Sequence, residues 1–317
     1  MVPLGLTLIE AVAPATSANL GAGFDVFGVA LNALFDKVTV EKINDEAIKI
    51  EVYGEGSGEI PVEPEKNTAG IVAMEMLKRA RERCGLMIRV YKGIRPGSGL
   101  GSSAASAAAT AVAINDLLGL NLTPIQLIET AAMGEVASAG SPHADNVSAA
   151  ILGDFTLIVS REPLEVLKLK LPPNAEFAIV IPEIKVDTRL ARSVLPKQVS
   201  LSSMVYNIGR AAAFIAGIAL NSIEVMGKGM MDAIIEPARA HLIPGLSHVK
   251  EAALKAGAAG VAISGAGPSV IALVDSEKVN ANEVALVMRD AFKEVGVKSK
   301  PLCAKPGCGA QVIGRER

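Results

Sequence analysis

Three glycine-containing loops carry the residues of this chain whose types and spacing are best suited to chemistry. The strongest is PGSGLGSSAASAAATA at 96–111, where Gly97, Gly99 and Gly101 alternate with other residues before two serines. Glycines permit a backbone path that residues with a Cβ avoid, and amides at the start of a helix can bind an anion. The loop fits neither the Walker pattern, because no lysine follows its last glycine, nor the dinucleotide pattern GxGxxG. The alternative is a tight strand-to-helix turn.

The other two loops are weaker signals when each is taken alone. SGAGP at 264–268 lies between two apolar runs and is typical of either an anion-binding turn or a β-hairpin. PATSANLGAGFD at 14–25 could be an irregular connection, but it carries Asn19 and Asp25 beside glycines in a loop, where ligand contacts are common. Three such loops in one chain indicate a phosphorylated small-molecule ligand such as a nucleotide.

Several polar side chains stand among small or apolar residues. Glu135 is the only charged residue of AAMGEVASAG, where a carboxylate either lies on a solvated helix face or, if buried, needs a partner or a metal. His143 and Asn146 belong to HADN, which lacks the GxSxG pattern of a hydrolase and is compatible with a structural histidine. Three further candidates, which could bind polar groups of a small ligand, are Thr188, Arg192 and Arg239.

Composition narrows the classes of partner. The 317 residues include 31 Lys and Arg against 33 Asp and Glu, so no basic field exists to recruit nucleic acid or anionic lipid. The absence of Trp and the presence of only three Tyr and seven Phe argue against the stacking platforms of single-stranded nucleic-acid binders. We therefore expect small molecules and copies of the same chain as partners.

We expect a cytoplasmic protein without a membrane span. The apolar window at 206–220 is short and contains Arg210, and the N-terminal stretch lacks the basic region of a signal peptide. Three cysteines fit a reducing compartment, and Cys303 and Cys308 have no second cysteine or histidine pair nearby to complete a zinc site.

The elements that would position these residues alternate between strands and helices. Apolar periodicity and capping residues predict helices over 67–83, 102–118, 123–138, 144–151, 188–196, 201–220, 222–235, 244–256 and 280–295. Strands are predicted over 6–13, 36–43, 47–53, 86–94, 154–160, 165–171 and 176–181, on both sides of SGAGP, and near the end of the chain. A composition break near 160–174 predicts two domains, 1–160 and 161–317.

The three loops, in this order, resemble those of the GHMP kinase superfamily. They stand here as PATSANLGAGFD, RPGSGLGSSAA and SGAGPS. Longer runs, namely PATSANLGAGFDVFGVAL, SPHADNV, DTRLAR and EPARAHLIPG, resemble the homoserine kinase family in particular. The resemblance extends over nearly the whole chain.

This resemblance implies an α+β fold of two domains with the active site in the cleft between them. The N-terminal domain would be a ribosomal-protein-S5-like α/β domain, and the C-terminal one a ferredoxin-like α+β domain. The implied activity is transfer of the γ-phosphate of ATP to the hydroxyl of L-homoserine, with Mg²⁺ as cofactor, in threonine biosynthesis by a homodimer. The alternatives are a related kinase for shikimate or a mevalonate derivative, and a catalytically silent ligand sensor.

The resemblance also implies roles for individual residues. Asn67 and Lys92 would lie near the nucleotide, and Ser103 and Glu135 would hold Mg²⁺. The residues around the ATP phosphates would be Pro96, Gly97, Ser98, Gly99, Leu100, Gly101, Ser102, Ser103, Ala104 and Ala105. Those around homoserine would be Asn19, Asp25, His143, Asn146, Thr188, Arg192, Arg239 and Gly265.

Galactokinase-like and mevalonate-kinase-like members of the superfamily resemble one another in using an Asp as the base in this region. This chain has Asn146 there instead. An amide cannot accept that proton, so catalysis would depend on alignment and charge neutralisation. Glu135, Ser103 and Asn146 are accordingly the expected catalytic residues. Asp145 is adjacent to Asn146, but neighbouring positions of a helix point about 100° apart. We therefore keep Asp145 only as a minor alternative base.

Overall fold

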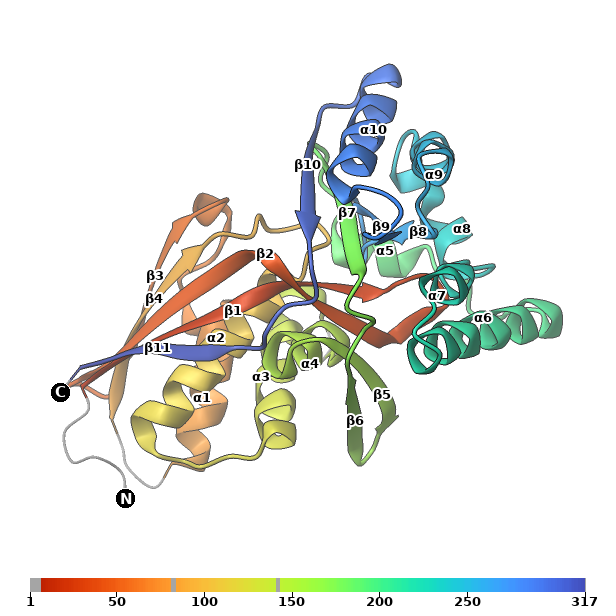
Figure 1. Cartoon of the computed structure of the whole chain (residues 1–317). Coiled ribbons are helices and arrows are strands. Elements are labelled where there is room, and N and C mark those ends of the chain that lie inside the picture. The colour runs from red at the N-terminus through yellow and green to blue at the C-terminus, as the bar shows by residue number, and fades with distance from the viewer. Residues whose placement is uncertain (1–6, 81–83, 141–142, 317) are drawn as a thin grey trace.

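Two β-sheets organise the chain, and helices pack against each of them (Figure 1). The computed structural model describes residues 7–80, 84–140 and 143–316. Within these ranges the first sheet has seven strands: five in the order β11-β1-β2-β4-β3, and a hairpin of β5 and β6 attached to β2. They are β1 (Leu8–Asn19), β2 (Gly23–Ile43), β3 (Ile48–Gly54), β4 (Gly85–Lys92), β5 (Phe155–Arg161), β6 (Leu164–Leu169) and β11 (Gln311–Glu316).

A layer of helices covers one face of this sheet and completes the first lobe (Figure 1). The helices are α1 (Thr68–Arg79), α2 (Ser102–Leu118), α3 (Pro124–Ala139) and α4 (Asp145–Leu152). α2 packs on β1 and β2, because its small buried alanines allow a close approach to the sheet. The predicted helix over 102–118 is confirmed. The predicted cap is also confirmed, because the Thr123 hydroxyl accepts the Gln126 N–H and Pro124 opens α3.

The second lobe is built on an antiparallel sheet in the order β10-β7-β9-β8. Its strands are β7 (Ala175–Pro182), β8 (Gly260–Ile263), β9 (Val270–Asp275) and β10 (Ser299–Ala304). Its helices are α5 (Thr188–Ser193), α6 (Leu201–Ala219), α7 (Ile223–Gly229), α8 (Ile235–Arg239), α9 (Leu246–Lys255) and α10 (Ala281–Glu294). Short 3₁₀ helices are η1 (Ser57–Glu59), η2 (Pro64–Lys66) and η3 (Ala240–Leu242).

Two apolar cores hold the lobes, and one of them joins the lobes together. α9 and α10 pack with the second sheet around a core of its own. Phe214 of α6 instead packs against Phe27 of β2 and Phe155 of β5, with ring centroids 5.4 and 5.2 Å away. α6, which lies between β7 and β8 in the sequence, therefore contributes to the core of the first lobe.

Sheet membership divides the chain differently from the expected domains 1–160 and 161–317. β5 and β6 pair across residue 160 as one antiparallel hairpin, and both belong to the first sheet. The last strand, β11, returns to the first sheet and pairs with β1. By sheet membership the chain crosses to the second lobe between β6 and β7 and comes back after β10.

The single helix predicted over 222–235 is wrong. α7 ends at Gly229, and α8 begins at Ile235. The interruption has a local cause, because the Asp232 carboxylate accepts the backbone N–H groups of Ile235 and Glu236 at 3.1 and 2.7 Å. An aspartate that binds the first amides of a helix favours a new helix start at that point.

α6 extends over 201–219, further towards the N-terminus than the 206–220 window considered from sequence. By length and composition alone α6 is able to cross a membrane, although core helices of soluble proteins pass the same test. Most of α6 is exposed, and Figure 1 shows it projecting from the body of the molecule.

Candidate active site

A cavity of about 300 Å³ lies where the two lobes meet, and residues of both lobes form its walls. The phosphate-loop segment 96–101, α3 and the start of α4 contribute from the first lobe, and α5 and the SGAGP loop contribute from the second. The expected site residues that line it are Asn19, Asp25, Asn67, Lys92, Pro96, Gly97, Gly99, Gly101, Ser102, Ser103, Glu135, His143, Asn146, Thr188, Arg192, Arg239 and Gly265.

Four expected nucleotide residues lie behind the cavity wall. Ser98, Leu100, Ala104 and Ala105 are buried and are not among the lining residues. The Ser98 carbonyl accepts the N–H of Ser269, and the Leu100 carbonyl accepts the N–H of Thr16. Ser98 and Leu100 therefore anchor the loop from its inner side. Two residues of the SPHADNV run, at positions 141 and 142, lie outside the described residues.

The alternating glycines of the phosphate loop are required by their conformation and by close packing. Gly97, Gly99 and Gly101 all have positive φ values, of 69°, 82° and 64°. A Cβ at Gly99 would lie 2.6 Å from the Ser264 carbonyl oxygen, so the SGAGP loop packs directly on this turn. Gly101 is the N-cap of α2, whose first backbone amides therefore open towards the loop.

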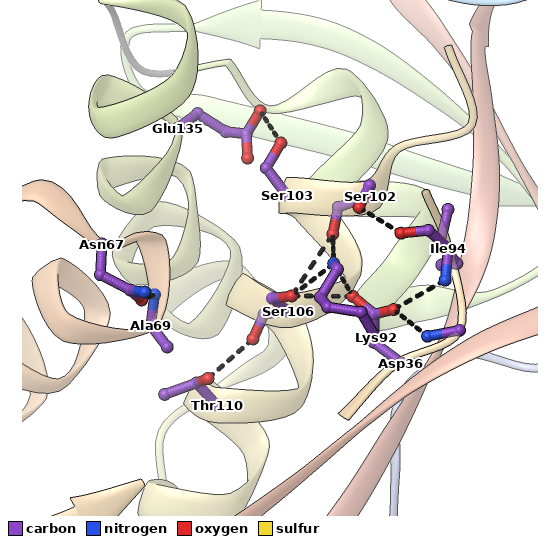
Figure 2. Close-up of polar contacts among 11 residues, drawn as sticks. Asp36, Asn67, Ala69, Lys92, Ile94, Ser102, Ser103, Ser106, Thr110 and Glu135 are labelled. Atoms are coloured by element: carbon purple, nitrogen blue, oxygen red, sulfur yellow. Dashed lines mark hydrogen bonds and ion pairs between the residues drawn. The ribbon is translucent and has the colours of Figure 1, made fainter. Parts of the chain in front are cut away.

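A buried polar network supports the loop from below (Figure 2). The ammonium of Lys92 forms an ion pair with Asp36 and donates to the Ser102 carbonyl and the Ser106 hydroxyl, each at 2.8 Å. Asp36 also accepts the backbone N–H groups of Gly93 and Ile94 at 3.0 and 3.1 Å. Burial lowers the pKa of Lys92, although the Asp36 charge opposes that effect. Lys92 thus connects β4 and β2 to the first turn of α2.

Asn67 lines the cavity and also caps the start of α1. It is the N-cap of α1, and its side-chain oxygen accepts the N–H of Ala69 at 2.8 Å. Its side-chain nitrogen donates to the Pro61 carbonyl at 2.6 Å. The Asn67 side chain therefore joins α1 to the preceding segment.

Glu135 and Ser103 meet at the other side of the loop (Figure 2). The Ser103 hydroxyl donates to Glu135 Oε2 at 3.1 Å. Burial raises the pKa of Glu135 to about 7, and the nearby charge of Asp145 adds to the increase. A carboxylate and a hydroxyl are the hard oxygen ligands that Mg²⁺ accepts. Among the described residues no cluster of three His, Cys, Asp or Glu could hold a metal ion.

Asp25 lines the cavity among arginine side chains. Arg192 donates to both of its carboxylate oxygens, at 2.8 and 3.2 Å, and Arg161 approaches it at 3.1 Å. Burial alone would raise the pKa of Asp25, but hydrogen bonds and charge from Arg192 and Arg161 hold it below its ordinary value. Arg192 also lies 3.3 Å from His143 Nδ1, and burial together with the Arg192 charge lowers the pKa of His143.

Arg239 is almost fully buried beside this group. Its guanidinium donates to the carbonyls of Ala191 and Gly265 at 3.0 and 3.1 Å. The guanidinium groups of Arg192 and Arg239 lie 5.6 and 5.4 Å from the centre of the Phe24 ring, within cation–π range. Arg161, Arg192 and Arg239 therefore gather around Asp25, and Asp145 lines the same cavity.

The SGAGP segment is a hairpin loop that joins the lobes. β8 and β9, which flank it, pair as antiparallel neighbours, so the hairpin alternative is confirmed as a description of the backbone. The Ser264 hydroxyl lies 2.7 Å from the Gly99 carbonyl, and the Asn19 side chain donates to the Gly265 carbonyl at 2.8 Å. The loop places Gly265 between the phosphate loop and the β1–β2 turn.

Four residues of this region were not predicted from sequence, namely Thr16, Phe24, Asp36 and Arg161. Asp36 interrupts an apolar run, LFDKVTV, and a charge inside a strand-like run is a signal that could have been followed. Thr16 and Phe24 belong to PATSANLGAGFD but were not singled out within it, and Arg161 carries no comparable signal. Only the folded chain brings these three to residues more than a hundred positions away.

Comparison with known proteins agrees with this arrangement. The family model described as GHMP kinases N terminal domain matches residues 67–154, and that described as GHMP kinases C terminal matches residues 214–294. The chain belongs to the GHMP kinase family. The first match contains the phosphate loop and Glu135, and the second contains the SGAGP loop. The expected two-domain α+β fold of a GHMP kinase is confirmed, and the protein is an ATP-dependent kinase.

Individual relatives of this GHMP kinase are similar over most of their length. The homoserine kinase of Methanocella arvoryzae is 46% identical over 97% of this chain and 98% of the relative. That of Methanococcus vannielii is 45% identical over 90% of this chain and 92% of the relative. The crystal structure of homoserine kinase from Cytophaga hutchinsonii superposes with a TM-score of 0.92 at 39% identity and covers 97% of this chain and 98% of that chain.

Proposed function

We propose that this GHMP kinase transfers the γ-phosphate of ATP to the hydroxyl of L-homoserine, forming O-phospho-L-homoserine for threonine biosynthesis. The charge pattern around Asp25 carries the proposal. The Asp25 carboxylate lies beside the guanidinium groups of Arg192 and Arg239 in the wall of the cavity that the nucleotide loop also lines. A zwitterionic amino acid offers an ammonium to Asp25 and a carboxylate to the two arginines. The homoserine kinase names of the relatives support the same substrate.

The phosphate loop and the start of α2 bind the phosphates of ATP in this proposal. Backbone amides of the segment 96–103 that line the cavity surround the phosphates, and Asn67 and Lys92 line the same cavity. Homoserine is surrounded by the other expected residues of the cavity wall, namely Asn19, His143, Thr188 and Gly265. A Cβ at Gly99 or Gly101 would collide with Ser264 or Thr16, so the glycines are needed for the loop to adopt this shape around the phosphates.

Ser103 and Glu135 would hold Mg²⁺ next to the phosphates. The ion would neutralise charge on the β- and γ-phosphates when bound. Glu135 must lose its proton to act as a ligand, and its raised pKa, about 7, lies close to neutral pH. Burial of this carboxylate beside the phosphate loop is the observation that supports the metal role.

The homoserine hydroxyl attacks the γ-phosphorus without an aspartate base at position 146. Asn146 lines the cavity, but a carboxamide does not accept the hydroxyl proton. The rate enhancement comes from alignment of the hydroxyl with the γ-phosphate and from neutralisation of the negative charge on the phosphates. The proton passes to an oxygen of the transferred phosphate.

We further propose that the enzyme is a cytoplasmic homodimer. Exposed apolar side chains on α6, at Leu201, Met204, Val205 and Ile208, follow the spacing of one helix face. α6 contains Arg210 as its one charged residue and no acidic one, so a second copy of the face meets little repulsion. This surface supports association of two copies of the chain.

A panel of acceptors tests the proposed reaction. With MgATP, we expect ADP release with L-homoserine and a new phosphate ester on its side chain, detected by mass spectrometry. Shikimate, mevalonate and galactose should give at most background release. Turnover of another acceptor in preference to homoserine would reassign the substrate, and binding of homoserine without turnover would identify a ligand sensor.

A further inference from the structure

Thr16 connects the inner side of the phosphate loop to Asn146, a residue of the cavity wall. Its side chain is fully buried at a point on β1 where the first sheet meets the phosphate loop. Its backbone N–H donates to the Leu100 carbonyl at 3.1 Å, and its hydroxyl donates to Asn146 Oδ1 at 2.8 Å. One residue therefore connects the phosphate loop to the amide that the proposed reaction places beside the acceptor hydroxyl.

Asp145 acts on the same carboxamide from its other side. Asp145 Oδ1 accepts the backbone N–H of Asn146 at 2.7 Å and lies 3.4 Å from Asn146 Nδ2. A carboxamide turned by 180° would place its oxygen against the carboxylate of Asp145 and would lose the attraction to that group. The Asp145 carboxylate, which can only accept, therefore selects this orientation of Asn146, and the Thr16 hydroxyl holds it by donating to Oδ1.

Gly101 leaves the space that this contact needs. A Cβ at position 101 would lie 1.9 Å from Thr16 Oγ1 and 3.1 Å from Asn146 Oδ1. The last glycine of the phosphate loop, β1 and the start of α4 thus meet at one hydrogen bond. A shift of any of these elements would move the Asn146 side chain.

We infer that Thr16 is a positioning residue which, together with Asp145, locks the Asn146 carboxamide with one N–H of Nδ2 donated to Asp145 and the other available to the acceptor hydroxyl. This inference rests on the proposed function. An N–H that donates to the hydroxyl oxygen leaves the hydroxyl proton directed elsewhere. In the transfer the oxygen–phosphorus bond forms, the bond from phosphorus to the bridging oxygen of ADP breaks, and the proton goes to a phosphate oxygen. Asn146 orients this oxygen and takes no proton.

The Thr16→Val variant removes the hydroxyl and keeps the side-chain size and the backbone contact to Leu100. We expect kcat to fall about 10- to 100-fold, the scale of a misaligned acceptor, with the Kd of an ATP analogue changed less than about threefold. Thr16→Ser restores the donor and should restore kcat. A role limited to shaping the loop would instead weaken nucleotide binding in Thr16→Val. If Thr16→Val does not fold, Thr16→Ala removes the same donor with less crowding and is judged by the same two measurements.

A double-variant cycle shows whether Thr16 acts through Asn146. In an Asn146→Ala background, Thr16→Val should have no further effect on kcat. An equal loss in both backgrounds, or an unchanged kcat in the single variant, would overturn the inference.

A measurement without turnover separates this inference from the proposed function. With ¹⁵N-labelled asparagine, the side-chain amide signal of Asn146 is identified by its loss in Asn146→Ala. We expect this signal to shift in Thr16→Val and to stay in place in Thr16→Ser. An unmoved signal in Thr16→Val contradicts the lock even if homoserine is turned over, whereas a wild-type protein inactive on homoserine with a shifted signal contradicts only the proposed substrate.

Discussion

The ammonium of Lys92 and the carboxylate of Asp36 form an ion pair that is almost completely withdrawn from solvent, with side-chain exposures of 2% and 0%. The pair lies under the phosphate loop, where Lys92 also forms part of the cavity wall, and it binds the start of α2 through Ser102 and Ser106. Because the pair is shielded from water, loss of one partner would leave the other as an uncompensated buried charge beneath the loop.

Removal of one partner of this pair should strongly destabilise the fold. We expect Lys92→Met to lower the free energy of unfolding by about 3–5 kcal/mol, because Asp36 would keep a buried charge without its partner. Adding Asp36→Asn should recover part of the loss, since the amide oxygen can still accept the N–H groups of Gly93 and Ile94. Urea unfolding measures both effects.

The matched control for this prediction is Lys37→Met. Lys37 pairs with Glu10 at 3.1 Å, but both side chains are more than a third exposed. Its loss should cost at most about 1 kcal/mol. A Lys92→Met variant no less stable than Lys37→Met would refute a supporting role for the buried pair.

The pH dependence of stability should report Glu135. Its pKa is about 7 in the folded protein and near 4.5 when unfolded, so the folded state binds more protons between these values. The Glu135 contribution to the free energy of unfolding is then present below about pH 4.5 and is lost as pH rises through 7. Glu135→Gln should stabilise the metal-free protein at pH 8 and have little effect at pH 4.5, as measured by urea unfolding.

Bound Mg²⁺ should offset the loss of stability that ionised Glu135 causes in the wild type at high pH. Because Mg²⁺ competes with the proton, added Mg²⁺ and nucleotide should bind more tightly as pH rises through 7, and Glu135→Gln should lose that dependence. Glu129→Gln, an exposed position on the same helix, is the control. Equal Mg²⁺ dependence in the Glu135→Gln and wild-type proteins would exclude the metal role.

Arg192→Leu should act on the amino acid and spare the nucleotide. Loss of the guanidinium leaves the homoserine carboxylate with Arg239 alone, a truncation that weakens binding by roughly 2–5 kcal/mol, or about 30-fold or more in KM. Steady-state kinetics with either substrate varied measures the change. Arg189→Leu, which alters an exposed neighbour on α5, should leave KM for homoserine near its original value. A change confined to the Kd of ATP would move the homoserine site elsewhere.

Gly101→Ala should impair nucleotide binding. Its Cβ would lie 1.9 Å from Thr16 Oγ1, and φ at this position is 64°, so the loop must shift or strain. We expect loss of most affinity for an ATP analogue in calorimetry, together with a reduced free energy of unfolding. Gly209→Ala on α6 meets no atom within 4 Å and should be neutral or slightly stabilising. Undiminished ATP binding by Gly101→Ala would contradict the proposed phosphate site.

A charge on the exposed face of α6 should separate the proposed dimer. Ile208 is 59% exposed in the single chain, so Ile208→Glu should leave the monomer folded and shift the mass measured by light scattering from dimer to monomer. Lys228→Glu, at another exposed site, is the control. A wild-type protein that is monomeric, or that binds lipid vesicles through α6, would contradict the dimer.

The sequence alone determined the local features of this enzyme. Glycines that need positive φ, a threonine and a proline at the start of α3, and an alanine-rich helix after two serines act over a few neighbouring residues, so their positions predict their structure. The phosphate loop and the helix over 102–118 were predictable for that reason. The break between α7 and α8 was missed, because a single aspartate at 232 decided it against an otherwise helical pattern.

Only the tertiary structure decided which distant residues share the site. Thr16 meets Asn146 across 130 positions, Arg161 meets Asp25 across 136, and Asp36 meets Lys92 across 56. Each contact depends on how strands pair and how the second lobe packs on the first, and no local pattern encodes those distances. The return of β11 to the first sheet and the membership of β6 in that sheet have the same origin. Pairing between strands joins segments that are remote in the chain, whereas sequence periodicity describes one segment at a time.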